Sequence, residues 1–73
     1  MSKASAAKPR HRLLLGERRR LIVEHVEEHG RATVEELAKN FHTSALTIRA
    51  DLDALANASA IVRSHGGALP VVP

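Results

Sequence analysis

Two short stretches of this sequence hold the side chains best suited to chemistry. The first, TSALTIRA, places Thr47 and Arg49 two residues apart in a segment of helical periodicity. The second, RSHGGALP, places Arg63 and His65 just before two adjacent glycines. A guanidinium can bind a guanine edge through two hydrogen bonds or bind a phosphate, and a hydroxyl can reach either group. Both stretches therefore indicate contact with nucleic acid.

Other chemistries find little support among these residues. His25 and His29 lie four residues apart, as two metal ligands on one helix would, but no third ligand follows at a suitable spacing. We expect His29 to be a partly buried surface residue. The chain has no cysteine, and no Gly-rich phosphate loop follows a strand. The sequence therefore predicts no enzyme, no metal site and no cofactor.

The charge is unevenly distributed along the chain. Up to Arg20 there are seven basic residues and one acid, whereas from Leu21 onward there are four basic and seven acidic residues, a net of −3. Residues 1–15 are predicted to be a flexible basic tail, which either binds phosphates or is merely solvated. No apolar run approaches the roughly 20 residues needed to cross a bilayer. We therefore expect no membrane association and a cytoplasmic location.

Two helices are predicted before the TSALTIRA stretch. Ile22 and Val26 recur at helical spacing within residues 17–29, and a glycine follows as a left-handed stop. A second amphipathic segment covers residues 34–41. Thr33 precedes it, with a glutamate three residues later, which is the pattern of a capping box. The short RAT stretch between the two helices has room for only one strand.

A third helix is predicted over residues 45–56, with Ser44 as its cap. Its apolar residues Ile48, Leu52 and Leu55 form one stripe along the helix. Only the three residues HTS separate this helix from the second. Two helices joined by such a turn form a helix-turn-helix.

The outer face of the third helix is the predicted reading surface. Helical geometry turns Leu46, Ala50 and Asp53 away from the apolar stripe, with Thr47 and Arg49 beside them. Leu46 and Ala50 offer apolar contacts only, for example with a thymine methyl group. An alternative for Arg49 is a solvated surface charge paired with Asp53 one turn later.

A hairpin is predicted after the third helix. Residues 60–64 and 68–72 are strand-like, and Gly66 and Gly67 between them suit a tight turn. We expect that replacing either glycine with valine weakens DNA binding by more than it lowers thermal stability. The fold class is therefore mainly α with a small β-sheet: a winged helix-turn-helix of three helices and a C-terminal β-hairpin wing. The wing residues expected at its tip are Arg63, Ser64, His65 and Gly66.

The stretch TVEELAKNFHTSALTIRADLDAL followed by IVRSHGGAL resembles the N-terminal DNA-binding domain of the DeoR family of bacterial transcription regulators. The resemblance covers residues 18–69 and implies sequence-specific binding of double-stranded DNA, most often in repressors of carbohydrate-use genes. It implies that Asp51 orients Arg49 or the helix. The positions that it implies for DNA contact are Ser44, Thr47, Arg49, Arg63 and His65.

The chain departs from the family pattern at three positions. Ala50 stands where a second arginine is usual, Thr43 where a valine is usual, and Ser59 where a glycine is usual after the third helix. Ala50 therefore removes one expected contact. An alternative function is a protein-docking module without DNA binding, which exposed Leu46 and the net-negative folded part favour.

The resemblance also bears on the organisation of the chain. Residues 16–70 are predicted to be the DNA-binding domain and residues 71–73 the start of a linker. Members of the family carry a C-terminal sensor domain that binds a phosphorylated sugar and drives oligomerisation. We therefore expect a homo-oligomer only where such a domain is present, and the phosphorylated sugar to bind there.

Overall fold

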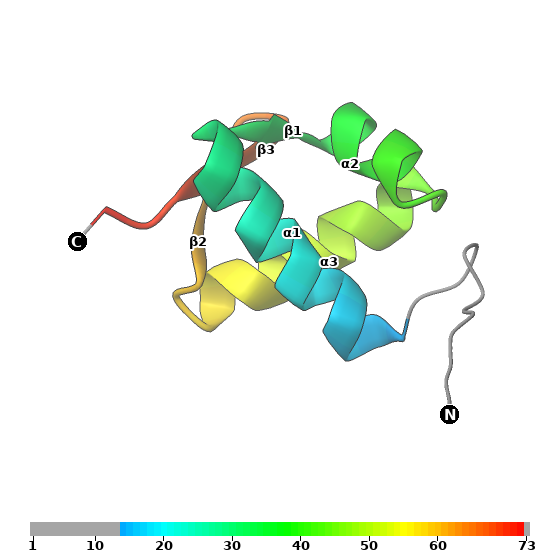
Figure 1. The fold of residues 1–73 in the computed structure, drawn as a ribbon, viewed down its shortest axis with the longest axis horizontal. Helices are drawn as coiled ribbons and strands as arrows, with labels where there is room; N and C mark the ends of the chain where they lie inside the picture. Colours follow the sequence, from blue (N-terminus) through cyan, green and yellow to red (C-terminus); the bar gives the residue numbers. More distant parts are fainter. Residues whose placement is uncertain (1–13, 73) are drawn as a thin grey trace, which may run out of the picture.

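The computed structural model describes residues 14–72, which form three helices and three short strands (Figure 1). The predicted basic tail lies almost entirely outside the described residues. The elements follow the predicted order, so the mainly helical winged helix-turn-helix is confirmed. In chain order they are α1 (Leu15–His29), β1 (Ala32–Thr33), α2 (Val34–Asn40), α3 (Ala45–Asn57), β2 (Ile61–Ser64) and β3 (Gly67–Pro70).

Helix α1 packs one apolar face against α3 and the sheet. Ile22 and Val26, the two residues predicted for this face, are fully buried. The helix begins at Leu15, two residues before the predicted start. Leu14 precedes it without a side-chain cap, so the usual sequence signal for a helix start is missing. Gly30 ends the helix as predicted, with a left-handed φ of 79°.

Helices α2 and α3 form the predicted helix-turn-helix. The capping box is present: the Glu36 amide donates to Thr33 Oγ1, and the Thr33 amide donates to Glu36 Oε1, both at 3.0 Å. Helix α2 ends at Asn40, one residue earlier than expected. Phe41 therefore lies just beyond the helix and is half-buried at the edge of the core.

The sheet has the order β1-β3-β2, with antiparallel pairing throughout. Strand β3 pairs with Ala32 and Thr33 on one side and with the whole of β2 on the other. The return strand was predicted over residues 68–72 but covers Gly67–Pro70. Gly67 thus belongs to the central strand, where it pairs with both neighbours, and not to the turn.

The core is aliphatic, as expected of a chain with a single aromatic residue. Ile48 and Leu52 of α3 are fully buried, and Leu55 packs against them at the edge. This confirms the predicted stripe of the third helix. The buried apolar residues are Ile22, Val26, Ala32, Val34, Leu37, Ile48, Leu52, Ile61 and Ala68.

The connection after α3 contains Ser59 in the left-handed region, with a φ of 62°. A side chain in this conformation costs about 1–2 kcal/mol, which glycine avoids. Ser59→Gly is therefore expected to raise the free energy of unfolding by about 0.5–1 kcal/mol, after the greater flexibility of glycine in the unfolded chain is subtracted. Urea unfolding would measure it. Ala58→Gly is the control and should destabilise the domain, because Ala58 has an ordinary φ of −86°.

Candidate nucleic-acid interface

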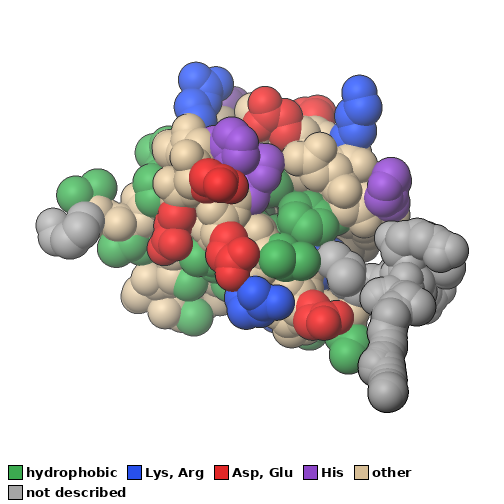
Figure 2. All heavy atoms as spheres, viewed as in Figure 1, with side chains coloured by type: hydrophobic (Ala, Val, Ile, Leu, Met, Phe, Trp, Pro, Cys, Tyr) green, Lys and Arg blue, Asp and Glu red, His purple; other side chains and the backbone are tan. Residues whose placement is uncertain are grey.

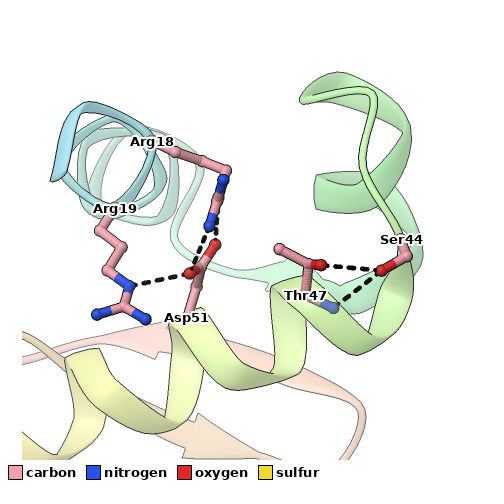
Figure 3. A network of polar contacts seen from close by, with 5 residues as sticks. All are labelled: Arg18, Arg19, Ser44, Thr47 and Asp51. Atoms are coloured by element: carbon pink, nitrogen blue, oxygen red, sulfur yellow. Dashed lines mark hydrogen bonds and ion pairs between the residues drawn. The ribbon is translucent and has the colours of Figure 1, made fainter. Parts of the chain in front are cut away.

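The candidate interface begins at the N-terminus of α3, which Figure 3 shows in detail. The Thr47 amide donates to Ser44 Oγ at 3.0 Å, which confirms the predicted cap. The Ser44 hydroxyl in turn donates to Thr47 Oγ1 at 3.0 Å. This pair fixes the first turn of α3, so Ser44 shapes the start of the helix. The Thr47 hydroxyl donates to no acceptor within residues 14–72, so its proton can serve a bound partner.

The next turn of α3 exposes the side chains that were predicted to face outward. Leu46 is 76% exposed, and Arg49 and Ala50 are exposed beside it. Thr47 is half-buried at the edge of this surface. Within residues 14–72, Arg49 makes no side-chain hydrogen bond or ion pair. The alternative pair between Arg49 and Asp53 is not formed, because Asp53 binds a different arginine.

That arginine is Arg63, which lies in the wing. Its Nε donates to Asp53 Oδ1 at 3.0 Å, and its Nη1 donates to the Gly67 carbonyl oxygen at 2.7 Å. Ser64 is half-buried, and His65 is exposed in the turn that follows. The predicted wing residues therefore lie at adjacent positions of one hairpin. Two nitrogens of Arg63 already have partners, one in the hairpin and one on α3.

The wing turn also contacts the start of α2. Gly66 has a φ of 78°, as a tight turn requires, and its carbonyl accepts the Val34 amide at 2.9 Å. A hollow of about 280 Å³ lies beside this turn, lined in part by Arg31, Ser64 and His65. Sequence reasoning missed Arg31 as a neighbour of the wing, because β1 brings it there across more than 30 residues of chain.

Of the two roles that the family resemblance implied for Asp51, the structure agrees with orienting the helix and not with orienting Arg49. Asp51 is buried, and it binds Arg18 and Arg19 of α1 and not Arg49 (Figure 3). Arg18 donates to both carboxylate oxygens, at 2.5 and 2.9 Å, and Arg19 donates to Oδ1 at 2.9 Å. Asp51 therefore fastens α3 to α1, which sets the position of the whole outer face of α3.

The ionisation of Asp51 reflects two opposed effects. Burial disfavours the charged carboxylate and by itself would raise its pKa. Hydrogen bonds from Arg18 and Arg19, together with their charges, outweigh the burial and hold the pKa of Asp51 below its ordinary value. The hydrogen bond to Asp51 raises the pKa of Arg18 against the opposing effect of burial. Asp51 and Arg18 are thus both charged at neutral pH.

The opposite side of α1 carries a different charge. Figure 2 shows acidic side chains over this face, where Glu24, Glu27 and Glu28 are exposed. Phosphates would be repelled there. Contact with DNA is therefore expected on another face of the domain.

The two histidines of α1 lie together but do not form a metal site. Their rings stack with centroids 4.2 Å apart, and His29 Nδ1 lies 3.0 Å from the His25 carbonyl oxygen. His25 is half-buried and His29 is exposed, so the expected partial burial of His29 was wrong. In the described part of the chain, no group of three or more ligating side chains could hold a metal ion.

The fold and this surface together define a winged helix-turn-helix domain of the kind found in DNA-binding transcription regulators. The chain belongs to the family of DeoR-like helix-turn-helix domains, whose family model matches residues 18–71. This match confirms the resemblance seen in the sequence. No helix within residues 14–72 combines the length and apolar character that crossing a bilayer would require.

Several curated proteins are similar to this chain over most of its length. The HTH-type transcriptional regulator GlpR of Haloferax volcanii is 46% identical over 59 residues, covering 81% of this chain and 23% of that protein. The L-fucose operon activator of Haemophilus influenzae is 47% identical over 49 residues, covering 67% of this chain and 20% of that protein. The glycerol-3-phosphate regulon repressor of Escherichia coli is 47% identical over 47 residues, covering 64% of this chain and 19% of that protein.

The chain thus spans about a fifth of the length of these three relatives. No solved structure matches the chain. The region that these relatives share with this chain is the DNA-binding domain. This similarity does not identify the genes that are regulated.

Proposed function

We propose that residues 16–70 bind a specific site on double-stranded DNA, with the N-terminal half of α3 in the major groove and the wing beside it. The observation that carries this proposal is Arg49. It is exposed on the outer face of α3 and has no partner among residues 14–72, so its guanidinium has no structural role within the domain. In a helix-turn-helix, this part of the second helix is the part that reaches base edges.

The remaining side chains have complementary roles in this proposal. Leu46 and Ala50 contact the methyl group of thymine, and Thr47 binds a base or a phosphate through its hydroxyl. His65, exposed in the wing turn, contacts the backbone of the adjacent groove. The residues proposed to lie at the interface are Ser44, Leu46, Thr47, Arg49, Ala50, Arg63, Ser64, His65 and Gly66.

The proposed biological role is repression of genes for the use of carbohydrates, in the cytoplasm. The support is the similarity to regulators named for glycerol 3-phosphate and L-fucose. The first of these is named a repressor and the second an activator. Where the native protein has a C-terminal sensor domain, a phosphorylated sugar would act on that domain, which would also make the oligomer. A reporter gene carrying the bound site would show repression or activation directly.

The first test is Arg49→Ala, measured by fluorescence anisotropy on a duplex selected from a random pool and on mixed duplex DNA. Loss of a base contact should cost about 1–3 kcal/mol on the selected site and much less on mixed DNA. Arg20→Ala is the matched control. It removes the same charge from an exposed pair with Glu24 on α1 and should leave both affinities nearly unchanged.

The outcomes separate the two functions considered for this fold. Equal weakening on both duplexes would make Arg49 a phosphate contact and move sequence reading to the rest of α3. A wild-type chain without salt-dependent binding to any duplex would contradict DNA binding altogether. It would favour the alternative, in which exposed Leu46 and its neighbours on α3 dock a protein partner.

A further inference from the structure

Arg63 joins three parts of the domain through a single guanidinium. It lies on β2 opposite Ala68 of β3, and its Nη1 donates to the Gly67 carbonyl at 2.7 Å, so the hairpin itself holds the side chain. Its Nε donates to Asp53 of α3 at 3.0 Å. Within residues 14–72 this is the only polar side-chain contact between α3 and the wing.

The partner of Arg63 is unexpected on a DNA-reading helix. Asp53 is 65% exposed at its side chain and lies one turn after Arg49. It is the only exposed acid of α3, because Asp51 is buried. A carboxylate near DNA is repelled by phosphates, so an acid at this position opposes binding unless it has another role.

We propose that Arg63 is a positioning residue that sets the angle between the wing and α3, with Asp53 as its anchor. The planar guanidinium can bind the Gly67 carbonyl and the carboxylate at once because its donors point in fixed directions. The bridge then places His65 at the groove next to the one that α3 enters. This inference rests on the proposed function, and it differs from the expectation that Arg63 is itself a phosphate contact.

The two roles predict opposite results for Asp53→Asn. If Arg63 contacts phosphate, removal of a nearby negative charge should tighten binding to DNA. If the bridge positions the wing, Asp53→Asn should weaken binding to the selected duplex by about three- to ten-fold. The melting temperature should move little in either case, because the pair is exposed. Fluorescence anisotropy and thermal unfolding of the same samples would give both values.

Two further variants complete the test. Arg63→Lys keeps the charge but cannot make both contacts in the same geometry, so it should weaken binding about as much as Arg63→Gln. The double variant Asp53→Asn with Arg63→Gln should be no weaker than either single variant, because both remove one bridge. The slope of log affinity against log salt should stay at its wild-type value in Arg63→Gln.

Three results would overturn the positioning role. These are tighter binding by Asp53→Asn, near-normal binding by Arg63→Lys, or a fall of about 0.9 in the salt slope of Arg63→Gln, which is the value for one lost phosphate contact. Each of them leaves DNA binding by the wild-type chain intact. Failure of the wild-type chain to bind any duplex would instead overturn the proposed function together with this inference.

Discussion

Gly67→Ala is expected to destabilise the domain more than any other change at the wing. A Cβ at this position would collide with the Ala32 carbonyl oxygen and lie 3.0 Å from Thr33 Cα. Both are backbone atoms of β1, so no side-chain rotation relieves the collision. The strands must separate, which we expect to cost about 3 kcal/mol or more. A domain of this size is stable by about 4–10 kcal/mol in total.

The matched control is Gly66→Ala, one residue earlier. Its Cβ would meet open space, and only the left-handed φ of 78° is strained, at a cost of about 1–2 kcal/mol. Urea unfolding of both variants would measure the difference, and equal destabilisation would contradict the close approach of β1 and β3. Only Gly66→Ala tests the wing in DNA binding, because the Gly67 variant also disrupts the pairing of β1 with β3. The expectation that both glycines act at the turn is therefore wrong for Gly67.

The second large effect is expected from Asp51→Ala. Removal of the carboxylate leaves Arg18 and Arg19 without their shared acceptor at the contact between α1 and α3. Loss of one member of a buried ion pair costs about 3–5 kcal/mol. The two arginine side chains are 14% and 28% exposed and can recover some hydration, so we expect about 2–3 kcal/mol here. Thermal or urea unfolding would measure this loss.

Asp53→Asn is the control for this loss, because it removes the same kind of charge from an exposed position of the same helix. Its effect on the free energy of unfolding should stay below about 0.5 kcal/mol. If Asp51→Ala were as mild as this control, the bridge between α1 and α3 would contribute little to the fold.

The same site predicts a dependence of stability on acid. The pKa of Asp51 is lowered in the folded domain, so the unfolded chain takes up a proton first, near its ordinary pKa of about 3.9. The stabilisation is therefore complete above about pH 5 and is lost as the pH falls through the folded pKa. The gap in stability between wild type and Asp51→Asn should narrow steadily below pH 4. A gap independent of pH would contradict the ion pair.

The sequence by itself determined the order of the elements and those of their ends that a local signal marks. The capping box at Thr33, the cap at Ser44 and the stop at Gly30 are local signals, because each satisfies backbone groups within a few residues. Helical spacing likewise identified the buried stripe of α3 and hence the exposure of Arg49. The proposed DNA contacts themselves stay a prediction, which the variants above would test.

Only the tertiary structure decided the roles of three other residues. Asp51 meets arginines that are 32 and 33 residues away, Gly67 packs against β1, and Arg63 binds an acid on α3. The sequence predicted a different role for Gly67 and for Arg63, and it left open whether Asp51 orients Arg49 or the helix. Whether a charged side chain meets solvent, DNA or another helix depends on which segments pack together, and whether a glycine is needed for its φ or for its size depends on the neighbouring strand. Neither is encoded in local spacing.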